Sequence, residues 1–279
     1  MGIKRQKLIS NFLTYSLLIV GLVIVAVPFW YMVATSMKPQ SYIFEMPPRL
    51  WPKQFTLQNY VDAITRDKFG LYFLNSVFVA VTSTLSTVLI SAMMAYAFAR
   101  LQFPGKNILY YVILLGMMIP PVTLLIPQFI IAKNLELVNK FSGLILVYIT
   151  MNISQQTFLL RVFFEGIPRE LEEAALMDGA GRWTIFSRII LPLSKPGLAA
   201  VTIFTFLYCW DEFAWAQVMM TDTAKRTLPI AIALFQSQHL TRWGLVFAAS
   251  IISFIPVLLV FIIFQKQFIK GISTTGIKG

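Results

Sequence analysis

The chain alternates between long apolar runs and shorter polar segments, and this pattern predicts helices that cross a membrane. A membrane-spanning helix needs about 20 consecutive, mostly apolar residues. Six such runs occupy residues 12–35, 71–99, 108–132, 141–160, 196–221 and 244–265. Asp211 and Glu212, both in the fifth run, are the charged residues inside them. We therefore expect an all-α membrane protein with six transmembrane helices.

The overall composition supports this expectation. Of 279 residues, 57% are apolar and 13% are charged, whereas soluble domains carry about 25% charged residues. Lipid offers the backbone no hydrogen-bond partner, which leaves helices or a closed barrel, and long unbroken apolar runs favour helices. The formal charge of +11 could suit nucleic acid. Basic residues that flank membrane helices and meet lipid headgroups explain this charge better, so we expect lipid and no nucleic acid as partners.

The polar ends and loops suggest how the chain is oriented. Lys4, Arg5 and Lys7 precede the first run as in a signal peptide, but this run is too long and lacks a clear cleavage site. We expect a retained helix and a single membrane domain, residues 1–279. Lys and Arg are slightly more frequent on the side of the N-terminus, which weakly favours cytoplasmic termini. The Pro-rich residues 37–70 predict an external loop with a short interfacial helix near residues 57–64.

A charged segment, residues 161–195, separates the fourth and fifth runs and predicts a helical hairpin. Pro168 suits a first helical turn, and the acidic residues that follow it favour the positive end of the helix dipole. Four residues at helical spacing form one narrow face with small side chains. They are Leu171, Ala174, Ala175 and Asp178. Gly179 can take the left-handed conformation that ends a helix.

A second short helix follows in the same segment. It carries Trp183, Phe186 and Ile190 on one face, and Pro192 helps to end it. Small alanines on the first helix allow another protein to approach closely, and exposed carboxylates can pair with its basic groups. The alternative from the residues alone is an amphipathic hairpin that only covers the end of the bundle.

The spacing within this segment resembles a known signature. Glu173-Ala174-Ala175, three residues, Gly179, nine residues and then Ile189-x-Leu191-Pro192 resemble the EAA signature of permease subunits in binding-protein-dependent ABC importers. Other stretches are similar to the sugar-importer branch of that family. They are Asn75-Ser76, Ala95 to Arg100 with Phe103-Pro104-Gly105, Ile119-Pro120-Pro121 with Leu125-Ile126-Pro127 of a broken third span, Trp210-Asp211-Glu212-Phe213, and the tail from Phe268 to Gly279. Asp211 departs from the branch, which commonly has Asn there.

The resemblance implies an ABC importer type I permease of the maltose-type smaller subunit, with a cytoplasmic coupling helix between spans 4 and 5. It implies a second homologous permease, an ABC ATPase dimer that binds ATP and Mg, and an extracytoplasmic substrate-binding protein. No cofactor is expected on this chain. The implied ATPase-coupling residues are Glu172, Glu173, Ala174, Ala175, Asp178 and Gly179. The implied ATPase-contacting tail residues are Gly276, Lys278 and Gly279; a free, solvated tail is the alternative.

Polar and aromatic residues at membrane depth are the candidates for a substrate pathway or gate. An acid inside the membrane costs about 3 kcal/mol and should face a cavity or a partner. Sugars can stack on aromatic rings and bond to acids and amides. The candidates are Tyr208, Trp210, Asp211, Glu212, Trp215, Gln155 and Met117. The alternatives are an interfacial aromatic belt, hydrogen bonds between spans through Asn152, Gln155 and Gln156, and plain methionine packing.

The motifs that the sequence lacks favour a transporter over an enzyme. The sequence has no Gly-x-x-x-x-Gly-Lys-Ser/Thr phosphate loop, nucleophile elbow, His-Glu-x-x-His or Cys-x-x-Cys, so ATP hydrolysis is assigned to partner subunits. His239 is the one histidine and is expected in an external loop, which argues against a metal site. The expected cargo is a carbohydrate, with a glycerol phosphate or a compatible-solute glycoside as the alternative. A stand-alone secondary transporter, a channel and a membrane scaffold remain as other classes.

Overall fold

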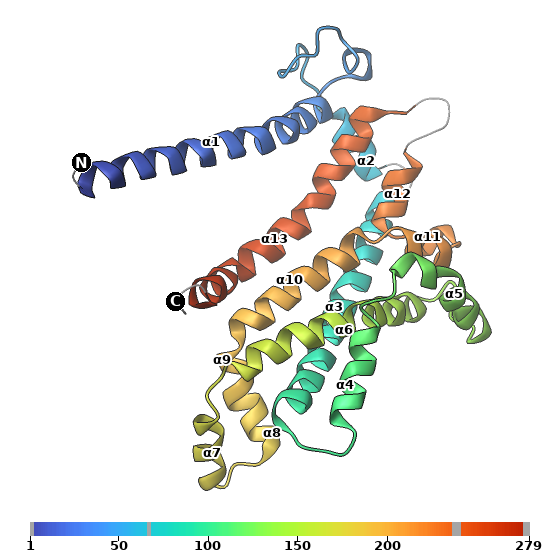
Figure 1. Ribbon diagram of the computed structural model, residues 1–279. Coiled ribbons are helices and arrows are strands. Elements are labelled where there is room, and N and C mark those ends of the chain that lie inside the picture. The colour runs from blue at the N-terminus through green and yellow to red at the C-terminus, as the bar shows by residue number, and fades with distance from the viewer. Residues whose placement is uncertain (1–2, 66–67, 236–240, 276–279) are drawn as a thin grey trace. The chain divides into compact units, whose positions relative to one another are not determined.

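The chain folds into helices joined by turns and loops (Figure 1). The computed structural model describes residues 3–65, 68–235 and 241–275, and within these ranges it contains no β-strand. Four helices in the described ranges are long and apolar enough to cross a membrane. They are α1 (Ile3–Ser36), α3 (Phe69–Arg100), α6 (Phe141–Glu165) and α13 (Trp243–Thr275). Each contains one of the predicted apolar runs, so the all-α fold class is confirmed.

The predicted third span, residues 108–132, is interrupted. Its parts are α4 (Lys106–Leu115), the short 3-10 turn η2 (Pro121–Leu124) and α5 (Leu125–Asn134). Pro120 and Pro121 have no N–H group to donate, and Pro121 disfavours a helical backbone at Pro120, whose ψ is 127°. The break agrees with the resemblance to a broken third span.

The predicted fifth span, residues 196–221, is interrupted as well. α10 (Lys195–Asp211) ends before Glu212, whose backbone is extended (φ −67°, ψ 123°), and α11 (Ala214–Met219) follows. Within the described residues the number of spans reaches five if the pair Arg182–Leu193 and Lys195–Asp211, bent by 78°, counts as one. The prediction of six spans is therefore not confirmed.

The remaining helices are short. They are η1 (Gln40–Tyr42), α2 (Gln58–Thr65), α7 (Glu170–Met177), α8 (Arg182–Ile185), the π-turn η3 (Phe186–Ile190), α9 (Leu191–Leu193), η4 (Thr223–Lys225) and α12 (Leu228–Leu234). α2 lies where the loop helix was predicted. The described residues form two compact units, Met1–Phe69 with Ile232–Ser253 and Gly70–Ala231 with Phe254–Gly279. The single membrane domain remains a prediction.

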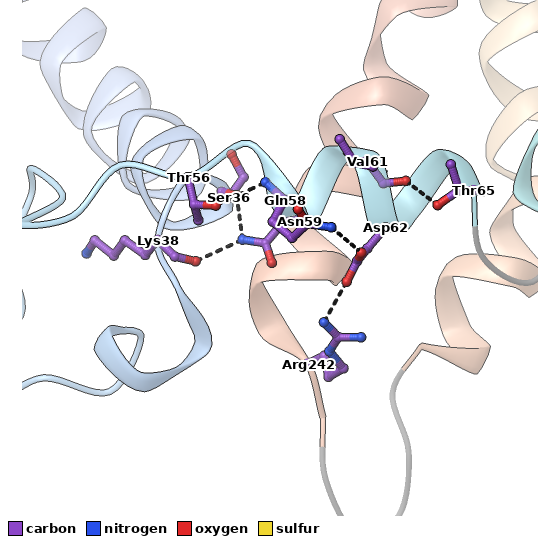
Figure 2. A network of polar contacts seen from close by, with 9 residues as sticks. All are labelled: Ser36, Lys38, Thr56, Gln58, Asn59, Val61, Asp62, Thr65 and Arg242. Carbon is purple, nitrogen blue, oxygen red and sulfur yellow. Dashed lines mark hydrogen bonds and ion pairs between the residues drawn. The ribbon is translucent and has the colours of Figure 1, made fainter.

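In the first unit, α2 is held by a polar network (Figure 2). The Asn59 amide donates to the backbone oxygens of Ser36 and Lys38, at 2.8 Å each. Asp62 accepts from Arg242, whose Nη2 lies 2.8 Å from Oδ2. A Cβ on Gly244 would lie 2.6 Å from Asn59 Nδ2, so the start of α13 approaches α2 closely. This network joins the end of α1, the loop helix α2 and the first turn of α13.

The loop that follows α1 is also fixed by aromatic and charged contacts. The Trp30 ring stacks on Trp51 with centroids 5.5 Å apart, and its indole N–H donates to Leu50 O at 3.0 Å. Lys53 Nζ lies 2.6 Å from Glu45 Oε1, and this hydrogen bond holds the pKa of the Glu45 carboxyl below its usual value. The loop is thus ordered by its own side chains.

In the second unit, α6 packs against α10, α4 and α11 (Figure 1). Its core joins the last turns of α3 and α6 to the segment that runs from α8 into α10. The buried members are Ala92, Ala95, Tyr96, Ala99, Leu160, Phe164, Ile185, Phe186, Ile190 and Val201. A Cβ on Gly197 would lie 2.6 Å from Phe163 Cγ, so only glycine lets the start of α10 come this close to α6. This packing positions the charged hairpin.

Candidate functional site

The charged segment between α6 and α10 forms the predicted hairpin of two short helices (Figure 1). α7 carries Glu170, Glu172 and Glu173 in its first turn, where the helix dipole favours negative charge. Gly179 follows with φ +81°, the left-handed conformation that was expected at the end of this helix. α8 then starts at Arg182, and its apolar residue Ile185 is fully buried.

One carboxylate of α7 points into the protein. The Glu172 side chain is 7% exposed, and its Oε1 lies 2.6 Å from Arg100 Nε at the end of α3. Arg100 is also buried, and its Nη2 donates to the backbone oxygens of Phe164 and Ile167 at 2.6 Å each. Glu172 therefore anchors α7 from the inside, which differs from the expectation that the carboxylates of this helix are exposed.

The other predicted coupling residues face outward or lie at the edge of the core. Glu173, Ala174, Asp178 and Gly179 are exposed, and Ala175 is partly buried against the core cluster. The narrow face predicted from helical spacing is thus accessible in this chain, because Leu171 and Ala174 on it are exposed as well.

The hairpin exposes large apolar side chains. Met177 is 88% exposed and Trp183 is 65% exposed, and Leu171 and Leu176 are also exposed. Trp183 was predicted to share a face with Phe186 and Ile190, but those two are buried while Trp183 contacts Phe186 with ring centroids 5.4 Å apart. Pro192 lies within α9 rather than ending the second helix, because the chain bends at Ser194. Exposed apolar side chains beside charged ones are typical of a protein interaction surface.

Glu212 is, after Glu172, the second carboxylate that is held by several contacts. It lies where the predicted fifth span breaks. Its carboxylate accepts from the Tyr148 hydroxyl at 2.8 Å, from Trp215 N at 2.8 Å and from Ala216 N at 3.0 Å. It therefore satisfies backbone donors at the start of α11, which have no partner inside that helix. It also ties α11 to α6 through Tyr148.

The predicted pathway aromatics are mostly buried within this unit. Trp210 is 1% exposed and packs against Phe73 and Phe206, each at 5.7 Å between ring centroids. Trp215 is 2% exposed. Tyr208 is partly buried and meets Tyr148 edge-on at 6.2 Å. Trp210 and Trp215 act here as packing residues.

Three further candidates are accessible on this unit. Asp211, Gln155 and Met117 are exposed. Asn152 and Gln156, predicted to share a face with Gln155, are buried, and Asn152 donates to Tyr148 O at 2.8 Å. Among the described residues, no hydrogen bond or ring contact joins Gln155 or Met117 to the cluster around Glu212. The tail residues Gly276, Lys278 and Gly279, and also His239, lie outside the described residues.

Two contacts of this unit, Arg100 with Glu172 and Tyr148 with Glu212, were not predicted from sequence. Arg100 was noted only as part of a family pattern, although its place at the end of an apolar run already suggested a buried or interfacial charge. Tyr148, in the predicted fourth span, was not considered, since a tyrosine among apolar residues gives no sign of its partner. Groups of three or more possible metal ligands are absent among the residues described.

Comparison with known proteins identifies this arrangement. Residues 87–274 match the family described as "Binding-protein-dependent transport system inner membrane component", which covers the hairpin, α10 and most of α13. The chain belongs to this family. As an inner membrane component it is a multi-pass transporter subunit, and the resemblance seen in the EAA-like spacing is confirmed.

Curated relatives extend over almost the whole chain of this inner membrane component. The diacetylchitobiose uptake system permease protein NgcG of Streptomyces coelicolor is 38% identical over 94% of this chain and 87% of its own length. The trehalose/maltose transport system permease protein MalG of Thermococcus litoralis is 35% identical over 94% and 96%, respectively.

A solved structure shows the same fold. It is the crystal structure of a bacterial ABC transporter involved in the import of the acidic polysaccharide alginate, and the aligned chain has a TM-score of 0.81. The alignment covers 95% of this inner membrane component and 98% of that chain, at 23% sequence identity. The likeness shows the ABC importer permease fold.

Proposed function

We propose that this chain is a permease subunit of an ATP-driven carbohydrate importer, and that its α7–α8 hairpin couples the closure of a separate ATPase to movement of the membrane helices. The observation that carries this proposal is the two-sided hairpin within the family-matched region. Its inner side is fixed by the buried Glu172 and Phe186, and its outer side exposes Glu173, Met177 and Trp183.

The outer side of the hairpin suits a docking partner with basic and apolar groups. Glu173 can pair with a positive side chain, and Met177 and Trp183 offer apolar area that water would otherwise cover. The two exposed small positions Ala174 and Gly179 let that partner approach closely. The partner that fits is the ABC ATPase dimer, which binds ATP and Mg.

We propose the other subunits by analogy with the family. A second homologous permease completes the pathway, and an extracytoplasmic binding protein delivers substrate. Both termini are cytoplasmic, and residues 276–279 reach the ATPase subunits. Among the pathway candidates, Glu212 holds α11 in place and Asp211 is accessible to a passing substrate.

The cargo class rests on the relatives, whose names include diacetylchitobiose, trehalose and maltose systems. An exposed carboxylate at Asp211 suits hydrogen bonding to sugar hydroxyls. We propose an oligosaccharide or a sugar derivative as cargo.

The test is purification of the tagged chain from its own membrane in mild detergent, followed by identification of co-eluting subunits. The proposal expects an ATPase and a second permease at stoichiometric amounts. Vesicles that carry this complex and its binding protein should take up at least one of labelled diacetylchitobiose, trehalose and maltose only when ATP is inside the vesicle. A chain that elutes alone, or uptake driven by an ion gradient without ATP, would instead indicate a secondary transporter.

A further inference from the structure

We infer that the buried Arg100–Glu172 ion pair is the link that carries movement of α7 to the membrane helices α3 and α6. This inference rests on the proposed function, because it needs an ATPase that moves α7. Its geometric basis is independent of that partner. The two side chains are 3% and 7% exposed, and Arg100 Nε lies 2.6 Å from Glu172 Oε1.

Arg100 joins three elements at one point. It is the last residue of α3, it pairs with the first turn of α7, and its Nη2 donates to Phe164 O and Ile167 O at 2.6 Å each. Phe164 is in the last turn of α6 and Ile167 lies just beyond that helix, and Phe164 O also accepts from Ile167 N at 3.1 Å. A guanidinium suits this position, since it carries five N–H donors in one rigid plane. An uncharged or shorter side chain could not hold all three elements together.

A buried charge pair resists separation in addition to the apolar packing around it. Separating the pair leaves two uncompensated charges in a medium of low dielectric constant. α7 therefore cannot leave the end of α3 without drawing Arg100 after it. The carbonyls of residues 164 and 167 then pass the displacement to α6.

A second contact on the same helix couples the other half of the hairpin. The Tyr96 hydroxyl donates to Arg182 O at 3.4 Å, and the Tyr96 ring lies 5.1 Å from that of Phe186. Tyr96 is one helical turn before Arg100, so both α7 and α8 meet the final turns of α3. The two helices of the hairpin therefore move α3 together, and the Arg100–Glu172 pair sets the direction of that movement.

A neighbouring pair provides the matched control. Arg161 Nε lies 2.7 Å from Glu165 Oε1 near the same end of α6, with side chains 22% and 46% exposed. Both residues belong to α6, and Glu165→Gln leaves the contact of Arg161 with the Tyr110 ring of α4, at 3.9 Å, in place. Its loss should leave coupling unchanged.

The experiment compares Glu172→Gln, the double variant Arg100→Met with Glu172→Met, and the control Glu165→Gln in the assembled complex. Replacing both members of a buried pair by apolar residues of similar size is often neutral for stability, whereas removing one is costly. The single variant should therefore lower the amount of complex. The double variant should assemble and hydrolyse ATP, but its uptake of labelled maltose, trehalose or diacetylchitobiose per ATP should fall about tenfold, within the usual range of coupling between sites. Whichever of these sugars the wild type transports is the probe.

The outcomes separate the inference from the proposed function. If the wild-type complex shows no ATP-dependent uptake, both the proposed function and the inference are rejected. If the wild-type complex shows ATP-dependent uptake and the double variant has the same uptake per ATP, the inference alone is overturned, because the pair would then be structural. Arg100→Lys keeps a charge for Glu172 but gives up the planar donor geometry, so it should assemble with reduced coupling. If neither the double variant nor Arg100→Lys assembles, the pair serves folding and the inference is rejected.

Discussion

Removal of the Glu212 carboxylate should destabilise the break in the predicted fifth span. This side chain accepts hydrogen bonds from Tyr148, Trp215 and Ala216 at 2.8, 2.8 and 3.0 Å, and all three donor residues are buried. A buried donor left without a partner costs about 1–3 kcal/mol, and hydrogen bonds in membrane proteins fall toward the lower end. At about 1 kcal/mol for each of three donors, Glu212→Ala loses roughly 3 kcal/mol. Glu212→Gln keeps one acceptor oxygen and should lose roughly 1 kcal/mol.

The assay is the midpoint of heat-induced loss of the size-exclusion peak for purified protein in detergent. A loss of 3 kcal/mol corresponds to a fall in the midpoint of roughly 6 °C or more for a chain of this size. The midpoint of Glu212→Gln should fall by about a third of that amount. Asp211→Asn is the matched control, since this neighbouring acid is exposed and has no hydrogen bond described. If the midpoint of Glu212→Ala equals that of the Asp211→Asn control, the carboxylate does not support α11 and the reasoning fails.

Three further outcomes are expected. Gly197→Ala places a Cβ 2.6 Å from the Phe163 ring and should lower stability by about 1–3 kcal/mol in the same heating assay. An unchanged midpoint would show that α10 can shift away from α6 without cost. Deletion of residues 273–279 should lower transport-linked ATP hydrolysis while membrane insertion, followed by blotting, stays normal; unchanged hydrolysis would make the tail dispensable. Asp211→Asn should alter relative uptake among several sugars per assembled complex, and a profile identical to wild type would rule out a selectivity role for Asp211.

Much of the architecture could be predicted from local patterns. Long apolar runs without charges specify helices by themselves, so α1, α3, α6 and α13 lie where they were expected. The left-handed Gly179 and the break at Pro120 and Pro121 follow from the chemistry of glycine and proline at those positions. These features depend on few residues that are close in sequence.

The sites were harder to predict because their partners are distant in the chain. Nothing near Glu172 distinguishes it from Glu173, yet one is buried against Arg100, 72 positions earlier, and the other is exposed. Likewise, Glu212 gains its role from Tyr148, which is 64 residues away. Trp210 and Trp215 were predicted as pathway residues from their aromatic character, and both are buried against other helices. A pathway role for them stays a prediction.

The central claim is that the hairpin couples ATP hydrolysis to transport, and the most direct test measures both quantities in one preparation. Glu173→Lys reverses an exposed charge on the outer side of α7, and Gly179→Asp strains a backbone at φ +81° where space for the side chain is open. In vesicles that contain normal amounts of the chain, the account predicts that either variant loses sugar uptake per ATP hydrolysed, or loses the ATPase altogether. Wild-type uptake per ATP from both variants at normal abundance would contradict it.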